Sequence, residues 1–149
     1  NKSSDRSNLS FFHTILETHD IYVTDIYKIF YREGQNISNN QKEFKRLSVH
    51  REIFKNEIKT VKPHYILTLG NDARDAICQI LDLNPPTWSD EIYTAKSKEN
   101  VNVIMVPHIS GSARGAKAPI LNNKFYADIA GTDNLKYARI IQHVISSKL

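Results

Sequence analysis

Apolar residues along this chain alternate between stripes at helical spacing and short continuous runs. Four segments are predicted as helices, from such stripes or from capping signals at their ends. They cover residues 8–17, 44–62, 71–83 and 134–148. Ser7 can cap the first helix, and Pro63 ends the second because proline lacks the backbone N–H that a helix interior needs.

Three short runs are apolar on both sides and rich in β-branched and aromatic residues, which is typical of strands buried between two layers. They cover residues 20–30, 64–69 and 102–106, and a polar loop (31–40) follows the first; residues 88–94 fit neither pattern. Because the strands alternate with helices, the sequence predicts a single α/β domain over residues 1–149. Its expected architecture is a three-layer αβα arrangement around a central, mostly parallel sheet with right-handed crossovers.

Ligands bind at the carboxyl ends of the strands in such sheets, so three short segments are the places to look for chemistry. The segment after the third strand, PHISGSARG, is the richest of them. His108 follows the buried strand directly, and small residues with accessible backbone N–H groups come next. Ser110, Ser112 and Arg114 add two hydroxyl groups and a guanidinium fork that suits a phosphate.

Residues 100–127 contain no acidic residue but include three basic ones, Arg114, Lys117 and Lys124. A basic, acid-free segment beside a strand-end histidine is what a protein that binds a phosphate backbone needs. The structural alternative is a histidine hydrogen-bonded to the backbone and followed by a solvated loop.

The other two strand ends give weaker signals. Gly70 permits a tight turn, and Asn71 is placed to cap the next helix, whose N-terminus could receive an anion. Neither a GxGxxG motif nor a P-loop is present, so a structural turn is favoured there. Asp25 is a carboxylate within an apolar run, which needs a partner or a function. Contact with a ligand N–H, a role as a base, pairing with Lys28 and capping of a neighbouring loop all stay open.

Composition narrows the class of protein further. The 149 residues are 40% hydrophobic and contain only five glycines and five prolines, which excludes disordered and collagen-like chains. No apolar run reaches the ~20 residues of a membrane span, and no signal segment is visible, so a soluble, cytoplasmic protein (nucleoid-associated in a bacterium) is expected. The net charge of +4 is a mild hint of a polyanionic partner.

The single cysteine, Cys78, excludes an internal disulfide, a four-thiolate zinc site and a cysteine-held iron–sulfur cluster. The histidines show no metal-ligand spacing such as HExxH. We therefore expect neither a metal nor another cofactor.

Four stretches, in the same order, resemble motifs of the uracil-DNA glycosylase superfamily. Residues 23–28, VTDIYK, are similar to the strand that carries the superfamily's base-reading residue. Residues 52–73 resemble its helix–strand–helix unit, and residues 7–16 resemble the helix that follows its first motif. Residues 106–115, VPHISGSARG, resemble its late motif, in which a strand-end histidine precedes Pro-Ser or a variant.

The resemblance implies a DNA glycosylase that flips a damaged or deaminated base, uracil or a related one, out of the duplex and hydrolyses its N-glycosidic bond. It implies that His108 donates a hydrogen bond to O2 of the departing base and that Asp25 contacts the Watson–Crick edge. It further implies that the remaining late-motif residues hold phosphates or fill the gap left by the base. These residues are Ser110, Ser112, Arg114 and Lys117. DNA is then the expected partner, and no cofactor is required.

Three departures from the superfamily pattern change these expectations. Its first, water-activating motif should precede Ser7, and nothing there resembles it, so the chain is expected to lack that motif and its strand. Asp25 stands where uracil-specific members carry Asn. An ionised carboxylate accepts from N3–H but repels O4, so a base offering two donors, or a protonated Asp25, fits better. Ile109 replaces the proline of His-Pro-Ser.

Two other classes of function stay open. One is a non-catalytic module of the same fold that binds nucleic acid or a partner. The other is a small-molecule nucleoside or nucleotide hydrolase, for which strand-end His and Asp residues are equally suitable.

Overall fold

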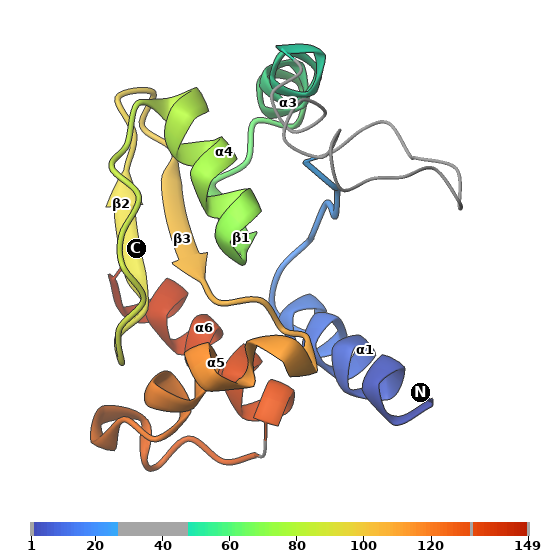
Figure 1. Cartoon of the computed structure of the whole chain (residues 1–149), viewed down its shortest axis with the longest axis vertical. Coiled ribbons are helices and arrows are strands. Elements are labelled where there is room, and N and C mark those ends of the chain that lie inside the picture. Colours follow the sequence, from blue (N-terminus) through green and yellow to red (C-terminus); the bar gives the residue numbers. More distant parts are fainter. Residues whose placement is uncertain (1, 27–47, 132, 149) are drawn as a thin grey trace.

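A small mixed sheet lies at the centre of the computed structural model, which describes residues 2–26, 48–131 and 133–148 (Figure 1). The middle strand β3 (Asn102–Val106) pairs in parallel with β1 (Tyr65–Leu69) and antiparallel with β2 (Tyr93–Lys96). The strands predicted over 64–69 and 102–106 are therefore confirmed. The sheet itself is mixed in the described part of the chain, where a mostly parallel one was expected.

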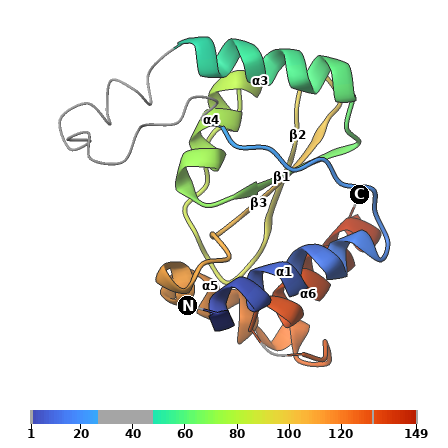
Figure 2. The same cartoon turned by 90° about the vertical axis from the view of Figure 1, so that its right-hand side faces the viewer.

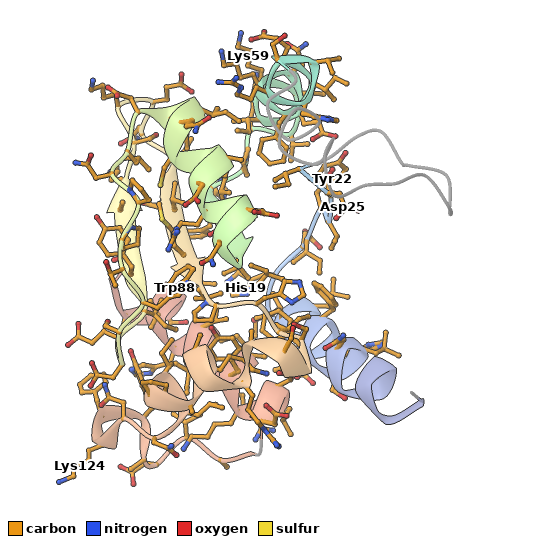
Figure 3. The ribbon with its side chains drawn as sticks, in the orientation of Figure 1. His19, Tyr22, Asp25, Lys59, Trp88 and Lys124 are labelled. Atoms are coloured by element: carbon orange, nitrogen blue, oxygen red, sulfur yellow. The ribbon has the colours of Figure 1, made fainter. Side chains whose placement is uncertain are left out.

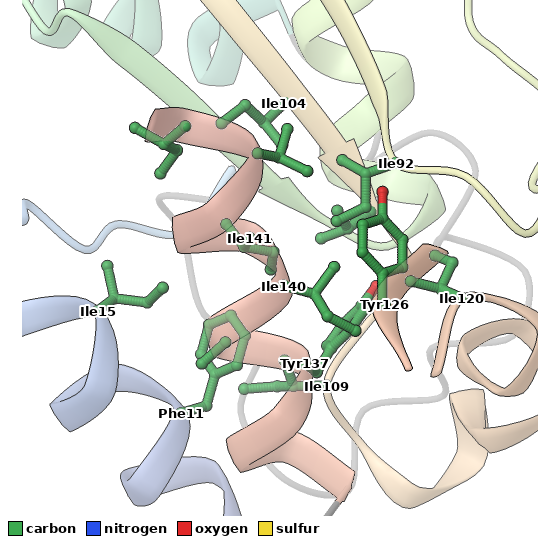
Figure 4. Packing of buried hydrophobic residues seen from close by; sticks show 14 residues of the cluster. Phe11, Ile15, Ile92, Ile104, Ile109, Ile120, Tyr126, Tyr137, Ile140 and Ile141 are labelled. Carbon is green, nitrogen blue, oxygen red and sulfur yellow. The ribbon is translucent and has the colours of Figure 1, made fainter. Parts of the chain in front are cut away.

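Helices cover both faces of this sheet, as the three-layer prediction expects (Figure 2). On one face α4 (Asn71–Leu81) packs against Val103 and Met105, and α3 (Ser48–Val61) lies over α4. The other face carries α1 (Lys2–Leu16), α5 (Arg114–Leu121) and α6 (Asp133–Lys148). The larger core cluster lies there, with α1 and α6 side by side (Figure 4).

Three predicted helices are found with small shifts at their ends, and α1 begins earlier than predicted. Because α1 starts at Lys2, Ser7 lies inside the helix and is not its N-cap. Helix α5 and the two 3-10 turns η1 (Gly111–Ala113) and η2 (Lys124–Tyr126) were not predicted. Glycine and proline are poor helix formers, and the short α5 contains both Gly115 and Pro119, which hides it from pattern analysis.

The first predicted strand is wrong for its described residues, 20–26, which are extended but belong to no strand. Instead of being buried, Tyr22 and Val23 are 60% and 64% exposed. The hydroxyl groups of Tyr22 and Thr24 donate to the carboxylate of Glu57 on α3. Strand propensity alone is insufficient, since a strand also needs a neighbouring edge for its backbone.

Several predictions concern residues whose structure is not described. These are residues 27–30 of the first strand, the loop at 31–40 and residues 44–47 of the second helix. Among the helices described here, none has the length and hydropathy needed to cross a membrane.

Candidate active site at the carboxyl end of β3

His108 follows β3 after one intervening residue, Pro107, and its side chain is exposed. The backbone N–H of Ser110 donates to Nδ1 of the imidazole over 3.0 Å. A neutral imidazole has one protonated and one unprotonated nitrogen. With Nδ1 accepting a hydrogen bond, the proton of neutral His108 lies on Nε2, which becomes the donor available to a ligand.

Gly70 lies directly against His108, because the parallel strands β1 and β3 end at the same edge of the sheet. Its N–H donates to the carbonyl of Val106 over 2.8 Å. Gly70 has φ 92° and ψ 178°, a conformation that is essentially restricted to glycine. A Cβ added there would lie 3.1 Å from Cβ of His108. Both the backbone conformation and the close approach therefore require glycine at this position.

Asn71 does not cap α4 as predicted, because Gly70 occupies the N-cap position and Asn71 is the first helical residue. The side-chain oxygen of Asn71 accepts a hydrogen bond from Nε1 of Trp88 over 2.7 Å instead. The Arg74 guanidinium lies 4.7 Å from the centre of the Trp88 ring and donates to the carbonyl of Pro86. These contacts attach the connection between α4 and β2 to the start of α4. The sequence pattern alone did not identify this role for Trp88.

Ser110, Ser112 and Arg114 follow His108 into η1 and the start of α5. The Ser110 and Ser112 hydroxyl oxygens are 2.8 Å apart, and the side chain of Arg114 is exposed. A Cβ added at Gly111 or at Gly115 would meet no atom within 4 Å. The surface beside His108 therefore carries small exposed residues and the exposed cation of Arg114.

The side chain of Lys117 is buried in the protein, whereas the sequence predicts that it contacts phosphate. The residue is 1% exposed. Its Nζ donates to the side-chain oxygen of Asn134 over 2.6 Å, to the carbonyl of Ile109 over 3.1 Å and to Asp133 over 3.2 Å. With three protein acceptors and almost no accessible surface, the ammonium group is not presented to a ligand in this conformation. The exposed Lys124 lies on η2, beyond the far end of α5 (Figure 3).

Asp25 lies on the extended segment that leads from α1 towards α3, close to Tyr22 (Figure 3). Its side chain is exposed. Within the described ranges, no hydrogen bond or ion pair connects it to His108. The structure thus places Gly70 against His108 and shows no direct contact of Asp25 with either by hydrogen bond or ion pair, so a base-reading role for Asp25 remains a prediction.

The chemistry available here does not involve a reactive thiol. Cys78 is buried, and burial, followed by the nearby Asp75 charge, raises the pKa of its thiol. Over residues 2–26, 48–131 and 133–148, no group of three or more His, Cys, Asp or Glu side chains could hold a metal ion.

Comparison with known proteins gives one family-level match. The model of the Uracil DNA glycosylase superfamily matches residues 5–130. No curated protein and no solved structure matches the chain. The matched range includes all three strand-end segments that the sequence singles out, with Asp25, Gly70 and His108 among them.

Proposed function

The chain belongs to the uracil-DNA glycosylase superfamily, and on that premise we propose that it is a DNA glycosylase that removes a damaged or deaminated base, uracil or a related one. The observation that carries this proposal is the geometry of His108. The imidazole is exposed at the carboxyl end of β3, and its Nδ1 already accepts a hydrogen bond from Ser110. Its Nε2–H is therefore the donor that faces a ligand.

Hydrolysis of an N-glycosidic bond leaves the bonding electron pair on the base, while water supplies the oxygen that bonds to C1′ of the sugar and loses one proton, which ends on the released base. Negative charge develops on the base, including on a carbonyl oxygen such as O2 of uracil. A fixed donor directed at that oxygen stabilises the transition state more than the ground state. His108 supplies this donor without becoming charged first. The base must leave the duplex to reach it, because the sheet edge cannot contact a stacked base.

Binding to DNA would involve the surface that follows His108. Arg114 provides a bidentate donor for a phosphate, and the hydroxyl pair of Ser110 and Ser112, in which one O–H donates to the other oxygen, leaves one further O–H as a donor. These contacts carry no base information, so they set the register of the duplex while contacts to the base itself, proposed for His108 and Asp25, select it.

Arg114→Ala is expected to weaken DNA binding about tenfold, whatever base the oligonucleotide carries. Losing one phosphate contact should also lower the slope of log Kd against log salt by about one. Fluorescence anisotropy over a salt series measures both quantities. Lys98→Ala is the matched control, since it removes the same charge from an exposed site before β3 begins, at the opposite end of that strand. Equal effects of the two variants would mean that Arg114 contributes only net charge.

Base release from a panel of labelled duplexes tests the proposed activity. The duplexes carry uracil, hypoxanthine, xanthine or a mismatch, and alkali-sensitive sites report the released base. We expect release from at least one of them, with Asp25→Asn shifting the preference towards uracil because an amide can also donate to O4. Failure of the protein to release any base would contradict the proposal.

One observation favours a non-catalytic DNA-binding module as the second candidate. Asp25 is exposed on the segment after α1, and in the described part of the chain it forms no hydrogen bond or ion pair with His108. Salt-sensitive DNA binding without base release from any duplex would support the module. Neither binding nor release would favour a hydrolase of small nucleosides or nucleotides.

A further inference from the structure

The backbone on both sides of His108 is held by buried side chains from two helices. The hydroxyl of Tyr137 on α6 donates to the carbonyl of Pro107 over 3.2 Å. The carbonyl of Ile109 accepts from Nζ of Lys117 on α5 and from Nδ2 of Asn134 on α6, each over 3.1 Å. The two residues that flank His108 are thus both fixed through their carbonyl groups.

These three side chains are among the least accessible in the molecule. Tyr137 is 0% exposed, Lys117 1% and Asn134 3%. Tyr137 and Ile109 belong to the same core cluster, on the side of the sheet that carries α1 and α6 (Figure 4). Burial raises the pKa of the Tyr137 hydroxyl, so this group stays protonated and remains a donor.

A buried ammonium group is costly unless all its donors are satisfied, and Lys117 meets this condition through an unusual set of acceptors. Only Asp133 carries a charge, and its side chain is 46% exposed. The shortest bond, 2.6 Å, goes to the neutral side chain of Asn134, whose amide also donates to Asn8 on α1 over 3.1 Å. A hydrophobic side chain of similar volume would fill the same space without this cost. Lys117 therefore contributes something other than packing.

The contribution follows from the covalent geometry of one peptide unit. The carbonyl of Ile109 and the N–H of Ser110 belong to the same planar peptide group and point in opposite directions. Lys117 holds the carbonyl, and the N–H donates to Nδ1 of His108. Fixing one end of this unit orients the other, and the positive charge on the carbonyl polarises the N–H and strengthens its hydrogen bond.

We propose that Lys117 is a positioning residue for His108, acting through the Ile109–Ser110 peptide to keep the imidazole in the tautomer with its proton on Nε2. Asn134 holds the same carbonyl, and Tyr137 holds the peptide before His108. The catalytic consequence rests on the proposed glycosylase function, whereas the effect on the imidazole does not depend on it.

The test compares Lys117→Met with the wild-type protein by two measurements. Long-range ¹H–¹⁵N spectra of protein labelled at histidine nitrogens report the tautomer of neutral His108. Single-turnover base release at saturating enzyme reports the chemical step. We expect the variant to lose the single Nε2–H tautomer and to release base about a hundredfold more slowly, with the Kd for DNA changed less than about threefold.

Two further variants separate positioning from general destabilisation. Cys78→Ala disturbs the core cluster on the other face of the sheet and should leave both the tautomer and the rate unchanged. Asn134→Ala removes the other donor to the Ile109 carbonyl, so it tests the same peptide if Lys117→Met does not fold. We expect it to lower the rate about tenfold.

The two readouts keep this inference distinct from the proposed function. An unchanged His108 tautomer in a folded Lys117→Met protein, or in Asn134→Ala where only that variant folds, would overturn the positioning role. A changed tautomer in a protein that releases no base would support the positioning role and contradict the glycosylase.

Discussion

His108→Ala is expected to lower the rate of base release by about two to three orders of magnitude, the usual effect of removing one donor from a site of developing negative charge. The affinity for DNA should change little, because the phosphate contacts are proposed for Arg114 and its neighbours. The loss of rate is expected because the hydrogen bond from Ser110 to Nδ1 leaves Nε2–H as the group that donates to the base. Single-turnover assays separate this loss of rate from any change in binding.

His108→Gln sharpens this experiment, since the glutamine amide can donate a hydrogen bond but cannot titrate near neutral pH. We expect it to retain more activity than His108→Ala on the same oligonucleotide. A wild-type rate in the alanine variant would remove His108 from the reaction. Equal rates in the two variants would show that the imidazole acts by something other than its donor.

The sequence predicted the parts of the site that depend on local patterns. Strand β3 is a continuous apolar run, so the position of His108 just after it could be found without a structure. Gly70 follows the other parallel strand in the same way, and the two residues meet because parallel strands end at one edge. Local order along the chain therefore determines which residues gather at this edge.

Lys117 shows where pattern analysis fails. An acid-free segment with three basic residues indicates phosphate binding, yet the acceptors for this ammonium are on α6 and in the loop after β3. A short helix over 114–121 would have placed Lys117 three residues before the buried Ile120, on its inward face. Because Gly115 and Pro119 are poor helix formers, the sequence pattern does not predict that helix. The acceptors that allow the ammonium group to be buried come from other parts of the fold, which a local pattern does not reveal.

The strand prediction for residues 20–26 is wrong for a different reason. Its β-branched and aromatic residues have the composition of a buried strand, but the hydroxyl groups of Tyr22 and Thr24 bind Glu57 on α3. Conversely, β2 is only four residues long, with its terminal residues exposed, and carries no strong signal of its own. It is a strand because it pairs with β3, and since this pairing is antiparallel the sheet is mixed.

Gly70→Ala is expected to lower the free energy of unfolding by about 1–3 kcal/mol, since φ 92° with ψ 178° is a conformation that alanine strains to adopt. Urea denaturation measures this loss. Gly115→Ala is the matched control, because its added methyl meets no atom within 4 Å and alanine is the better helix former. That variant should be as stable as the wild type or slightly more stable.

The same Gly70 substitution should also slow base release by about ten- to a hundredfold in the molecules that remain folded. The new methyl would lie 3.1 Å from Cβ of His108, so either the turn or the imidazole must move, and a displacement of about 1 Å is enough to reduce the rate by that amount. Ile77→Val, in the α4 core cluster on the other face of the sheet, provides a variant that also loses stability, by about 0.5–1.5 kcal/mol. If both variants lose stability but keep the wild-type rate, the close approach of Gly70 serves only the turn. If only the Gly70→Ala variant releases base more slowly, the contact of Gly70 at the end of β1 with His108 helps to orient the imidazole towards the base.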